Sequence, residues 1–187
     1  MQKKTPSRVE LIVVGIGGMG VLVAGRVLAS AGLGTYKFTS AMPSYAIEKR
    51  GGLSECTVIL SDQEIASPIL DQAQTLMLLD SSQIKAFQGR VRPGGLVIAE
   101  SAGLKDKPDR KDFRLIQVSG LEIAMRIGGV LVNNLILLGA YTQLVKPLPP
   151  ESIQGELERR YRDNQAVLKQ NMEAFRQGLE LAKNLEV

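Results

Sequence analysis

The chain has 187 residues and a formal net charge of +4; 44% of its residues are hydrophobic and 22% are charged. This composition is typical of a globular protein with a substantial core, and we expect one domain over residues 1–187. Scattered basic residues without tryptophan argue against nucleic-acid binding, and the lack of a long apolar run or a signal-peptide pattern predicts no membrane contact and a cytoplasmic location.

Apolar runs separated by turn residues predict the strands. In chain order we expect strands at residues 11–14, 36–40, 53–60, 75–79, 96–99 and 113–118. A helix is predicted over residues 21–31, with glycines at its end, and a short helix after residue 80, capped by Asp80. From residue 121 the chain is predicted to be mostly helical, and its last helix begins after Pro150 and runs through Leu181.

This order of elements predicts the fold. Alternating strands and helices imply crossover connections, and hence a mostly parallel sheet with helices on both faces. The strand at residues 53–60 lies close behind its predecessor and can pair antiparallel. The predicted fold is therefore α/β and Rossmann-like, with a C-terminal helical segment that we expect to pack on its own sheet.

The residue types that the chain lacks exclude several kinds of catalytic and metal site. It has no histidine and one cysteine, Cys56. It therefore cannot form a Ser-His or Cys-His nucleophile pair or a histidine-bearing metal site, and one thiol cannot hold an iron–sulfur cluster, which takes about four. We expect no catalytic residue and no metal site, a buried apolar role for Cys56, and any electron chemistry on another chain.

A glycine-rich turn follows the first predicted strand. Its glycines are Gly15, Gly17, Gly18 and Gly20. The spacing fits the G-x-G-x-x-G pattern, in which backbone N–H groups at a helix start favour an anion. The acid that holds the ribose in nicotinamide-binding proteins is missing, because no acid occurs between Glu10 and Glu48. A purely structural turn remains the alternative.

A polar segment, residues 43–52, follows the second predicted strand. Its candidate site residues are Ser44, Tyr45, Glu48, Arg50, Gly51 and Gly52. We expect this segment to form a loop over the carboxyl ends of the strands, where open sheets bind ligands and partners. An arginine on a flexible glycine backbone suits a phosphate, a carboxylate or a partner's backbone. A surface salt bridge between Glu48 and Arg50 is the alternative.

Five motifs in order carry a resemblance. They are Gly15–Gly20 (GIGGMG), Pro43–Gly52 (PSYAIEKRGG), Ser61–Pro68, Asn134–Ala140 and Asn171–Gly178. Together they resemble the gamma subunit, or gamma domain, of the 2-oxoacid:ferredoxin (acceptor) oxidoreductases, most closely the 2-oxoglutarate or branched-chain 2-oxoacid type. Two departures stand out, because Met19 replaces the family's Gln and Ala46-Ile47 replace its Gly-Pro.

The resemblance implies a non-catalytic subunit of a complex that decarboxylates a 2-oxoacid and forms an acyl-CoA. It implies alpha, beta and ferredoxin-like partner subunits, which carry thiamine diphosphate, magnesium and iron–sulfur clusters. On this chain it implies no tightly bound cofactor, a role in assembly and a CoA contact. The implied site residues are Gly15, Gly17, Gly18, Gly20, Ser44, Tyr45, Glu48, Arg50, Gly51, Gly52 and Asn134. A homodimer is expected when the chain is isolated.

Two other functions stay open. The chain could be a stand-alone nucleotide-binding oxidoreductase of Rossmann type, which the missing ribose acid disfavours. It could also be a structural partner that binds no small molecule, in which case the glycines serve packing alone.

Overall fold

The computed structural model describes residues 6–45 and 52–185. The strands in these residues are β1 (Arg8–Ile16), β2 (Phe38–Tyr45), β3 (Leu53–Ser61), β4 (Ala73–Leu78), β5 (Val91–Glu100) and β6 (Arg114–Val118). The α-helices are α1 (Val21–Gly32), α2 (Ile84–Phe87), α3 (Gly120–Ile127), α4 (Asn133–Val145), α5 (Pro150–Tyr161) and α6 (Gln165–Lys183). Short 3₁₀ turns lie at Ser81–Gln83, Gln88–Arg90 and Val130–Val132.

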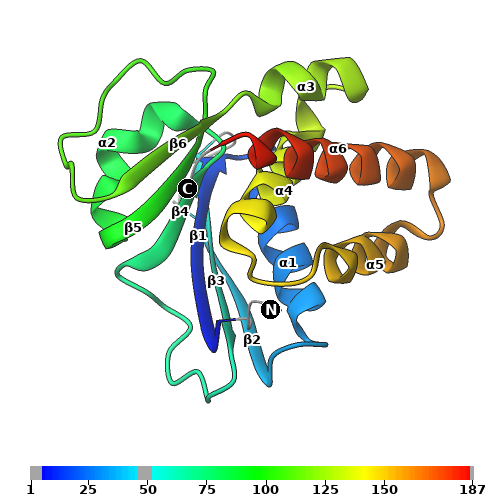
Figure 1. Cartoon of the computed structure of the whole chain (residues 1–187), viewed down its shortest axis with the longest axis horizontal. Helices are drawn as coiled ribbons and strands as arrows, with labels where there is room; N and C mark the ends of the chain where they lie inside the picture. Colours follow the sequence, from blue (N-terminus) through cyan, green and yellow to red (C-terminus); the bar gives the residue numbers. More distant parts are fainter. Residues whose placement is uncertain (1–5, 46–51, 186–187) are drawn as a thin grey trace.

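All the described strands form one sheet, in the order β2-β3-β1-β4-β5-β6. β1, β4, β5 and β6 are parallel, whereas β3 lies antiparallel between β1 and β2. The predicted α/β fold with a mostly parallel sheet is confirmed, and so is the antiparallel pairing of residues 53–60. Because β3 reverses direction, β2 runs the same way as β1, and both strands end at the carboxyl edge of the sheet, as Figure 1 shows.

Strand β2 is longer than the strand predicted at residues 36–40. It begins at Phe38 and continues to Tyr45, which pairs with Ser54. The prediction that Pro43, Ser44 and Tyr45 lie in a loop was therefore wrong. Hydrogen bonding to β3 keeps these residues in the strand, and a proline is tolerated because β2 is an edge strand. Glu48, Arg50 and Gly51, the rest of the predicted loop site, lie outside the described residues.

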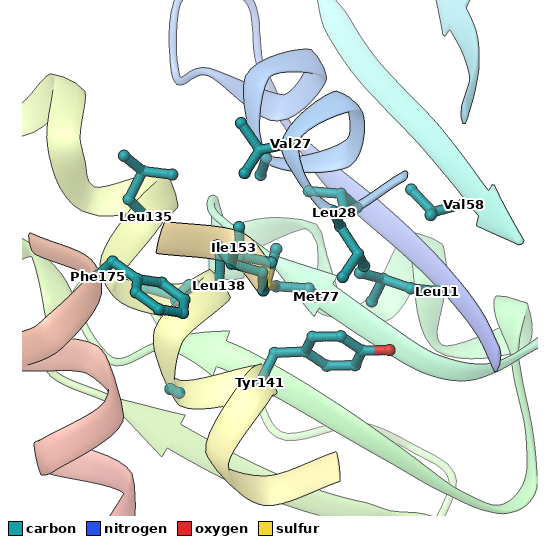
Figure 2. Close-up of a cluster of buried hydrophobic side chains, with 14 of the residues drawn as sticks. Leu11, Val27, Leu28, Val58, Met77, Leu135, Leu138, Tyr141, Ile153 and Phe175 are labelled. Atoms are coloured by element: carbon teal, nitrogen blue, oxygen red, sulfur yellow. The ribbon is translucent and has the colours of Figure 1, made fainter. Parts of the chain in front are cut away.

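Helices cover both faces of the sheet, as predicted, but unequally (Figure 1). On one face α1, α4, α5 and α6 bury a large cluster; Figure 2 shows Leu11, Leu28, Leu138 and Phe175 within it. On the other face the short α2 contributes Ile84 to a smaller cluster. The large cluster is apolar apart from a few polar groups such as the hydroxyl of Tyr141, which has no partner in the described residues.

The C-terminal helical segment is two helices, so the prediction of one helix from residue 151 to Leu181 was wrong. α5 ends at Tyr161, and the Asn164 side chain caps α6 by accepting a hydrogen bond from Val167 N at 3.2 Å. Asparagine favours such caps, because its short side chain replaces a missing helical acceptor. α6 then packs on α4, inside the chain's own core as expected.

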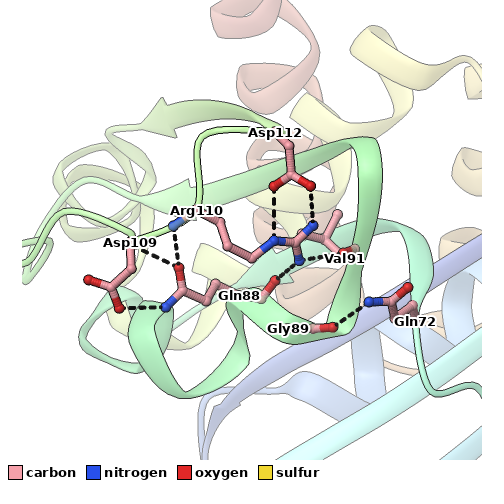
Figure 3. Close-up of polar contacts among 7 residues, drawn as sticks. All are labelled: Gln72, Gln88, Gly89, Val91, Asp109, Arg110 and Asp112. Atoms are coloured by element: carbon pink, nitrogen blue, oxygen red, sulfur yellow. Dashed lines mark hydrogen bonds and ion pairs between the residues drawn. The ribbon is translucent and has the colours of Figure 1, made fainter.

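The mixed-charge segment before β6, residues 105–112, is irregular and largely exposed. It is nevertheless anchored through Arg110, as Figure 3 shows. Arg110 donates to both carboxylate oxygens of Asp112 at 2.9 Å and to the carbonyls of Gln88 and Val91. The Arg110 hydrogen bond lowers the pKa of Asp112. The segment is thus held against the end of α2 by the hydrogen bonds of Arg110.

Candidate functional site

A cavity of about 430 Å³ lies at the carboxyl edge of the sheet. It is bordered by the glycine turn after β1, by the ends of β4 and β5, and by the start of α4. β1 leads into α1 on one face of the sheet, whereas β4 leads into α2 on the other. The chain therefore diverges between β1 and β4, and such a switch point is where open α/β sheets bind ligands. We call this space the carboxyl-edge cavity.

The glycine turn forms one wall of the cavity through Gly17 and Gly18. Gly18 has φ 94° and Gly20 has φ 77°, a left-handed backbone that favours glycine. Two of the turn's N–H groups are already used, because Gly17 N donates to Gly52 O at 3.0 Å and Met19 N donates to Ile16 O at 3.1 Å. The turn therefore offers an anion fewer donors than its sequence pattern suggests.

Glu100 ends β5 and is almost fully buried, with 2% of its surface exposed. One carboxylate oxygen accepts from Ala102 N at 3.1 Å and the other accepts from Leu121 N at 2.9 Å. The second contact places a negative charge at the N-terminus of α3, where the helix dipole stabilises it. Glu100 thus fixes α3 beside the cavity and gives the cavity an acidic wall.

Asp80 follows β4 and gives the cavity a second acid. It caps the 3₁₀ turn Ser81–Gln83, as predicted, by accepting from Ser82 N at 3.1 Å and from Ser82 Oγ at 2.8 Å through Oδ1. Its other oxygen, Oδ2, has a single long contact of 3.5 Å with Gln83 Nε2. Asp80 therefore keeps acceptor capacity on a half-buried side chain.

Asn133 opens α4 and lines the same cavity. Its side chain is 7% exposed, and its Oδ1 is buried without a hydrogen-bond partner in the described residues. A Cβ on Gly120 would overlap this oxygen and lie 3.1 Å from Glu100 Oε2. The amide of Asn133 and the carboxylate of Glu100 therefore border the same small space. A buried acceptor without a donor is rare in proteins.

Asn134, the predicted site residue, has a different role. Its Nδ2 donates to Gly20 O at 3.0 Å and its Oδ1 accepts from Leu135 N at 2.9 Å. The side chain is 3% exposed and does not border the carboxyl-edge cavity. Asn134 therefore fastens α4 to the glycine turn and positions the wall of the cavity, which its neighbour Asn133 reaches directly.

Ser44 lies apart from the glycine turn. It lines a second hollow of about 620 Å³, on the sheet face that α2 partly covers. Two charged side chains of this hollow are paired, because Arg90 makes two 2.9 Å hydrogen bonds to Glu55 and one of 2.8 Å to Leu70 O. Of the described residues from the polar segment, Gly52 is the one whose backbone reaches the glycine turn.

The structure thus divides the predicted site residues. Gly17 and Gly18 border the carboxyl-edge cavity, while Gly15, Gly20, Gly52 and Asn134 support its turn. The sequence reasoning missed Glu100 and Asn133. An acid directly after an apolar strand was an available signal for Glu100, whereas the motif Asn134–Ala140 pointed to Asn134 and nothing in the sequence pointed to Asn133.

Cys56 is buried in the core, and burial raises the pKa of its thiol to about 11. Residues 6–45 and 52–185 hold no cluster of three or more cysteine, aspartate or glutamate side chains that could bind a metal ion. No helix in the same ranges is long and apolar enough to cross a membrane.

The family model described as pyruvate ferredoxin/flavodoxin oxidoreductase matches residues 10–181. Ketoisovalerate oxidoreductase subunit VorA of Methanothermobacter marburgensis is 32% identical over 180 residues, 95% of this chain and 37% of VorA. 2-Oxoglutarate synthase subunit KorC of Archaeoglobus fulgidus is 32% identical over 180 residues, 96% of this chain and 91% of KorC. The chain thus spans little more than a third of VorA but nearly all of KorC.

Two solved structures share the fold. The gamma subunit of a keto/oxoacid ferredoxin oxidoreductase from Geobacter sulfurreducens PCA has a TM-score of 0.80 at 24% identity, covering 95% of this chain and 98% of that one. The 2-oxoglutarate:ferredoxin oxidoreductase from Magnetococcus marinus, with 2-oxoglutarate, coenzyme A and succinyl-CoA bound, has a TM-score of 0.86 at 20% identity. The match covers 97% of this chain and 32% of the Magnetococcus marinus chain. At these identities the likeness confirms the fold.

Proposed function

We propose a function from the premise that this chain belongs to the pyruvate ferredoxin/flavodoxin oxidoreductase family, whose model matches residues 10–181. The chain is the non-catalytic gamma subunit, or gamma domain, of a 2-oxoacid:ferredoxin oxidoreductase. The complex oxidatively decarboxylates a 2-oxoacid, of the 2-oxoglutarate or branched-chain type, to an acyl-CoA. The KorC and VorA names of its relatives support both substrate types.

One observation carries this proposal: a ligand-sized cavity at the switch point of the sheet, whose wall, among the described residues, offers groups that can bind a ligand but no histidine, cysteine, serine or lysine side chain. Its polar side chains are Asp80, Glu100 and Asn133, and the whole chain has no histidine to act as a base. Decarboxylation and electron transfer then belong to alpha, beta and ferredoxin-like subunits, which supply thiamine diphosphate, magnesium and iron–sulfur clusters.

CoA is the ligand that we assign to this edge of the chain. A cavity of about 430 Å³ beside a glycine turn accommodates part of such a molecule, within the range of about 300–1,000 Å³ for small-molecule sites. Gly17 and Gly18 would contact it, and Asn134 and Gly20 would hold the wall in place. Ser44, Tyr45, Glu48, Arg50 and Gly51 remain candidates for contact with CoA or a neighbouring subunit.

Reconstitution of the complex tests the function. The chain alone should show no turnover, and the complex should form acyl-CoA only when the chain is present. Arg50→Ala should raise the KM for CoA about tenfold, the loss of one charge-assisted contact, while Arg162→Ala, an exposed position between α5 and α6, should leave it unchanged.

Two results would contradict the proposal. One is full acyl-CoA formation by the partner subunits without this chain. The other is saturable NAD or FAD binding by the pure chain, which would instead support a stand-alone nucleotide-binding oxidoreductase.

The isolated chain should also dimerise, as measured by light scattering. Val130 and Leu131, at the mouth of the cavity, are 54% and 68% exposed, and we assign them to a surface that partner subunits cover in the complex.

A further inference from the structure

The glycine turn has the pattern of an anion-binding site, but the carboxyl-edge cavity beside it is acidic. Among the described residues that border it, the ionisable side chains are Asp80 and Glu100, and no lysine or arginine is present. Glu100 is buried, so water screens its charge poorly. A phosphate inside this cavity would face two carboxylates, with two N–H groups of the turn already bonded to the backbone.

The unpaired oxygen of Asn133 indicates what the cavity accepts instead. Oδ1 lies near the Glu100 carboxylate, because a Cβ on Gly120 would overlap Oδ1 and lie 3.1 Å from Glu100 Oε2, and no donor among the described residues bonds to Oδ1. A half-turn of the amide keeps its shape, offers Nδ2 to Glu100 beside the Leu121 N that already donates to Oε2, and turns Oδ1 away from Glu100 toward the cavity that Asn133 lines. In that state Asn133 Oδ1 and Asp80 Oδ2 are both acceptors available to a ligand.

The remaining walls are apolar. They are formed by side chains at the ends of β1 and β4, in α3 and in the turn before α4: Met19, Leu79, Leu121, Val130 and Leu131. Apolar walls with a few convergent acceptors suit an uncharged group that has an apolar body and N–H donors. Such a group satisfies the orphaned acceptor and brings no charge near the two acids.

We infer that the carboxyl-edge cavity binds the uncharged, N–H-bearing part of the ligand and excludes its phosphates. This rests on the proposed function in naming CoA as the ligand. Two parts of CoA have this chemistry, the adenine base with its exocyclic amine and the amide-bearing pantetheine arm. Both present an apolar body with N–H donors, and the phosphates then stay outside the cavity.

Methyl NMR of the purified full chain tests the inference without the complex. Adenosine, pantetheine and pyrophosphate are titrated separately, and the methyl signals of Leu121, Val130 and Leu131 are followed. We expect saturable shifts from adenosine or from pantetheine, which identifies the part that binds, and no shift from pyrophosphate. Shifts caused by pyrophosphate, or no shifts from any of the three probes, would overturn the inference.

A variant pair sharpens the test. Asn133→Leu removes the acceptor at nearly constant size and should weaken the binding probe at least tenfold. Gln177→Leu makes the same kind of change on the exposed side of α6 and should leave binding unchanged. Equal affinity in Asn133→Leu and the wild type would overturn the role of Asn133. Acyl-CoA formation by the reconstituted complex is scored separately, so the inference can fail while the proposed function stands.

Discussion

Helix α4 meets its surroundings in opposite ways at its middle and at its start. At Gly139 it crosses α6 so closely that a Cβ on Gly178 would overlap the backbone of Ile136. At Asn133, less than two turns away, it borders a cavity and leaves a buried oxygen unpaired. One helix therefore supports both a dense core and an open edge. Packing is dense at the crossing and open at the start of the helix, where the unpaired oxygen borders a cavity of ligand size, whereas the unpaired hydroxyl of Tyr141 is enclosed in the core.

The largest expected effect is on the reactivity of Cys56, a thiol buried in the densely packed core. Burial raises the pKa of Cys56, which lies against Gly25 of α1, to about 11. Against an ordinary thiol pKa of about 8.5, the thiolate fraction at pH 8 falls about 240-fold, so Cys56 should react with dithionitrobenzoate at least that much more slowly than in the unfolded chain. Rapid stoichiometric labelling of the native protein would show that this region is open.

The same shift gives a pH dependence. Because the folded pKa lies above the unfolded one, the thiol's contribution to stability is complete below about pH 8.5 and is lost as the pH rises toward about 11. Denaturant titrations of the wild type and Cys56→Ala between pH 8 and 11 isolate this contribution. Identical pH slopes in the two proteins would contradict the assigned cause.

The helix crossing should be the next most sensitive. Gly178→Ala forces α4 and α6 apart and should destabilise the fold by about 2 kcal/mol, an overpacking penalty of about 3 less about 1 gained in helix propensity. Thermal unfolding should then begin roughly 4–8 °C lower. Gly155→Ala, whose Cβ would meet nothing within 4 Å, is the control and should be neutral or slightly stabilising. The same melting temperature in Gly178→Ala and wild type would contradict the close packing of α4 on α6.

A smaller effect is expected at Asn134, which lies in α4 between the dense crossing and the cavity wall. Its amide joins α4 to Gly20 and has partners at both Nδ2 and Oδ1, so Asn134→Leu should cost about 1–2 kcal/mol, because Leu135 N loses its acceptor and Gly20 O keeps the donor Ala24 N but loses Nδ2. Chemical denaturation measures the loss. Hydrogen exchange should accelerate in the glycine turn before it does in α6, and uniform acceleration across the chain would argue against a local role.

The smallest expected effect is at Asn133. Asn133→Leu removes an oxygen that has no partner and, in the turned state of the amide, one donor to Glu100, which keeps Ala102 N and Leu121 N. The free energy of unfolding should therefore change by less than about 1 kcal/mol. The adjacent asparagines thus form a matched pair, one expected to matter more for stability and the other for binding. A loss in Asn133→Leu larger than the loss in Asn134→Leu would show that the Asn133 amide serves the fold.

The sequence predicted the fold class because hydrophobic periodicity and glycine turns are local signals. It failed where pairing or capping decided the result. The end of β2 depends on β3, which allows Pro43–Tyr45 to continue the strand. The break between α5 and α6 depends on the cap formed by Asn164, whose residue type is common in exposed helices as well.

The candidate site was only half predictable for the same reason. The glycine turn and the cap at Asp80 carry local patterns and were found. Glu100 and Asn133 gain their roles from Gly120, which lets an amide and a carboxylate approach from different elements. No spacing in the sequence encodes that approach. Asn134 has a motif and Asn133 has an unpaired oxygen, and only the assembled edge separates the two.

The place of β1 in the sheet has a consequence for how the chain is made. β1 is flanked by β3 and β4, and both are synthesised after it. Its run of buried residues, Val9–Gly15, therefore waits without a neighbour until Ser61 has been added, and without its second neighbour until Leu78. β3 can pair with β2 and β1 first, which closes the half of the sheet that carries the glycine turn. A nascent chain halted before Ser61 should hence be bound by chaperones, and one extended past Leu78 should be released.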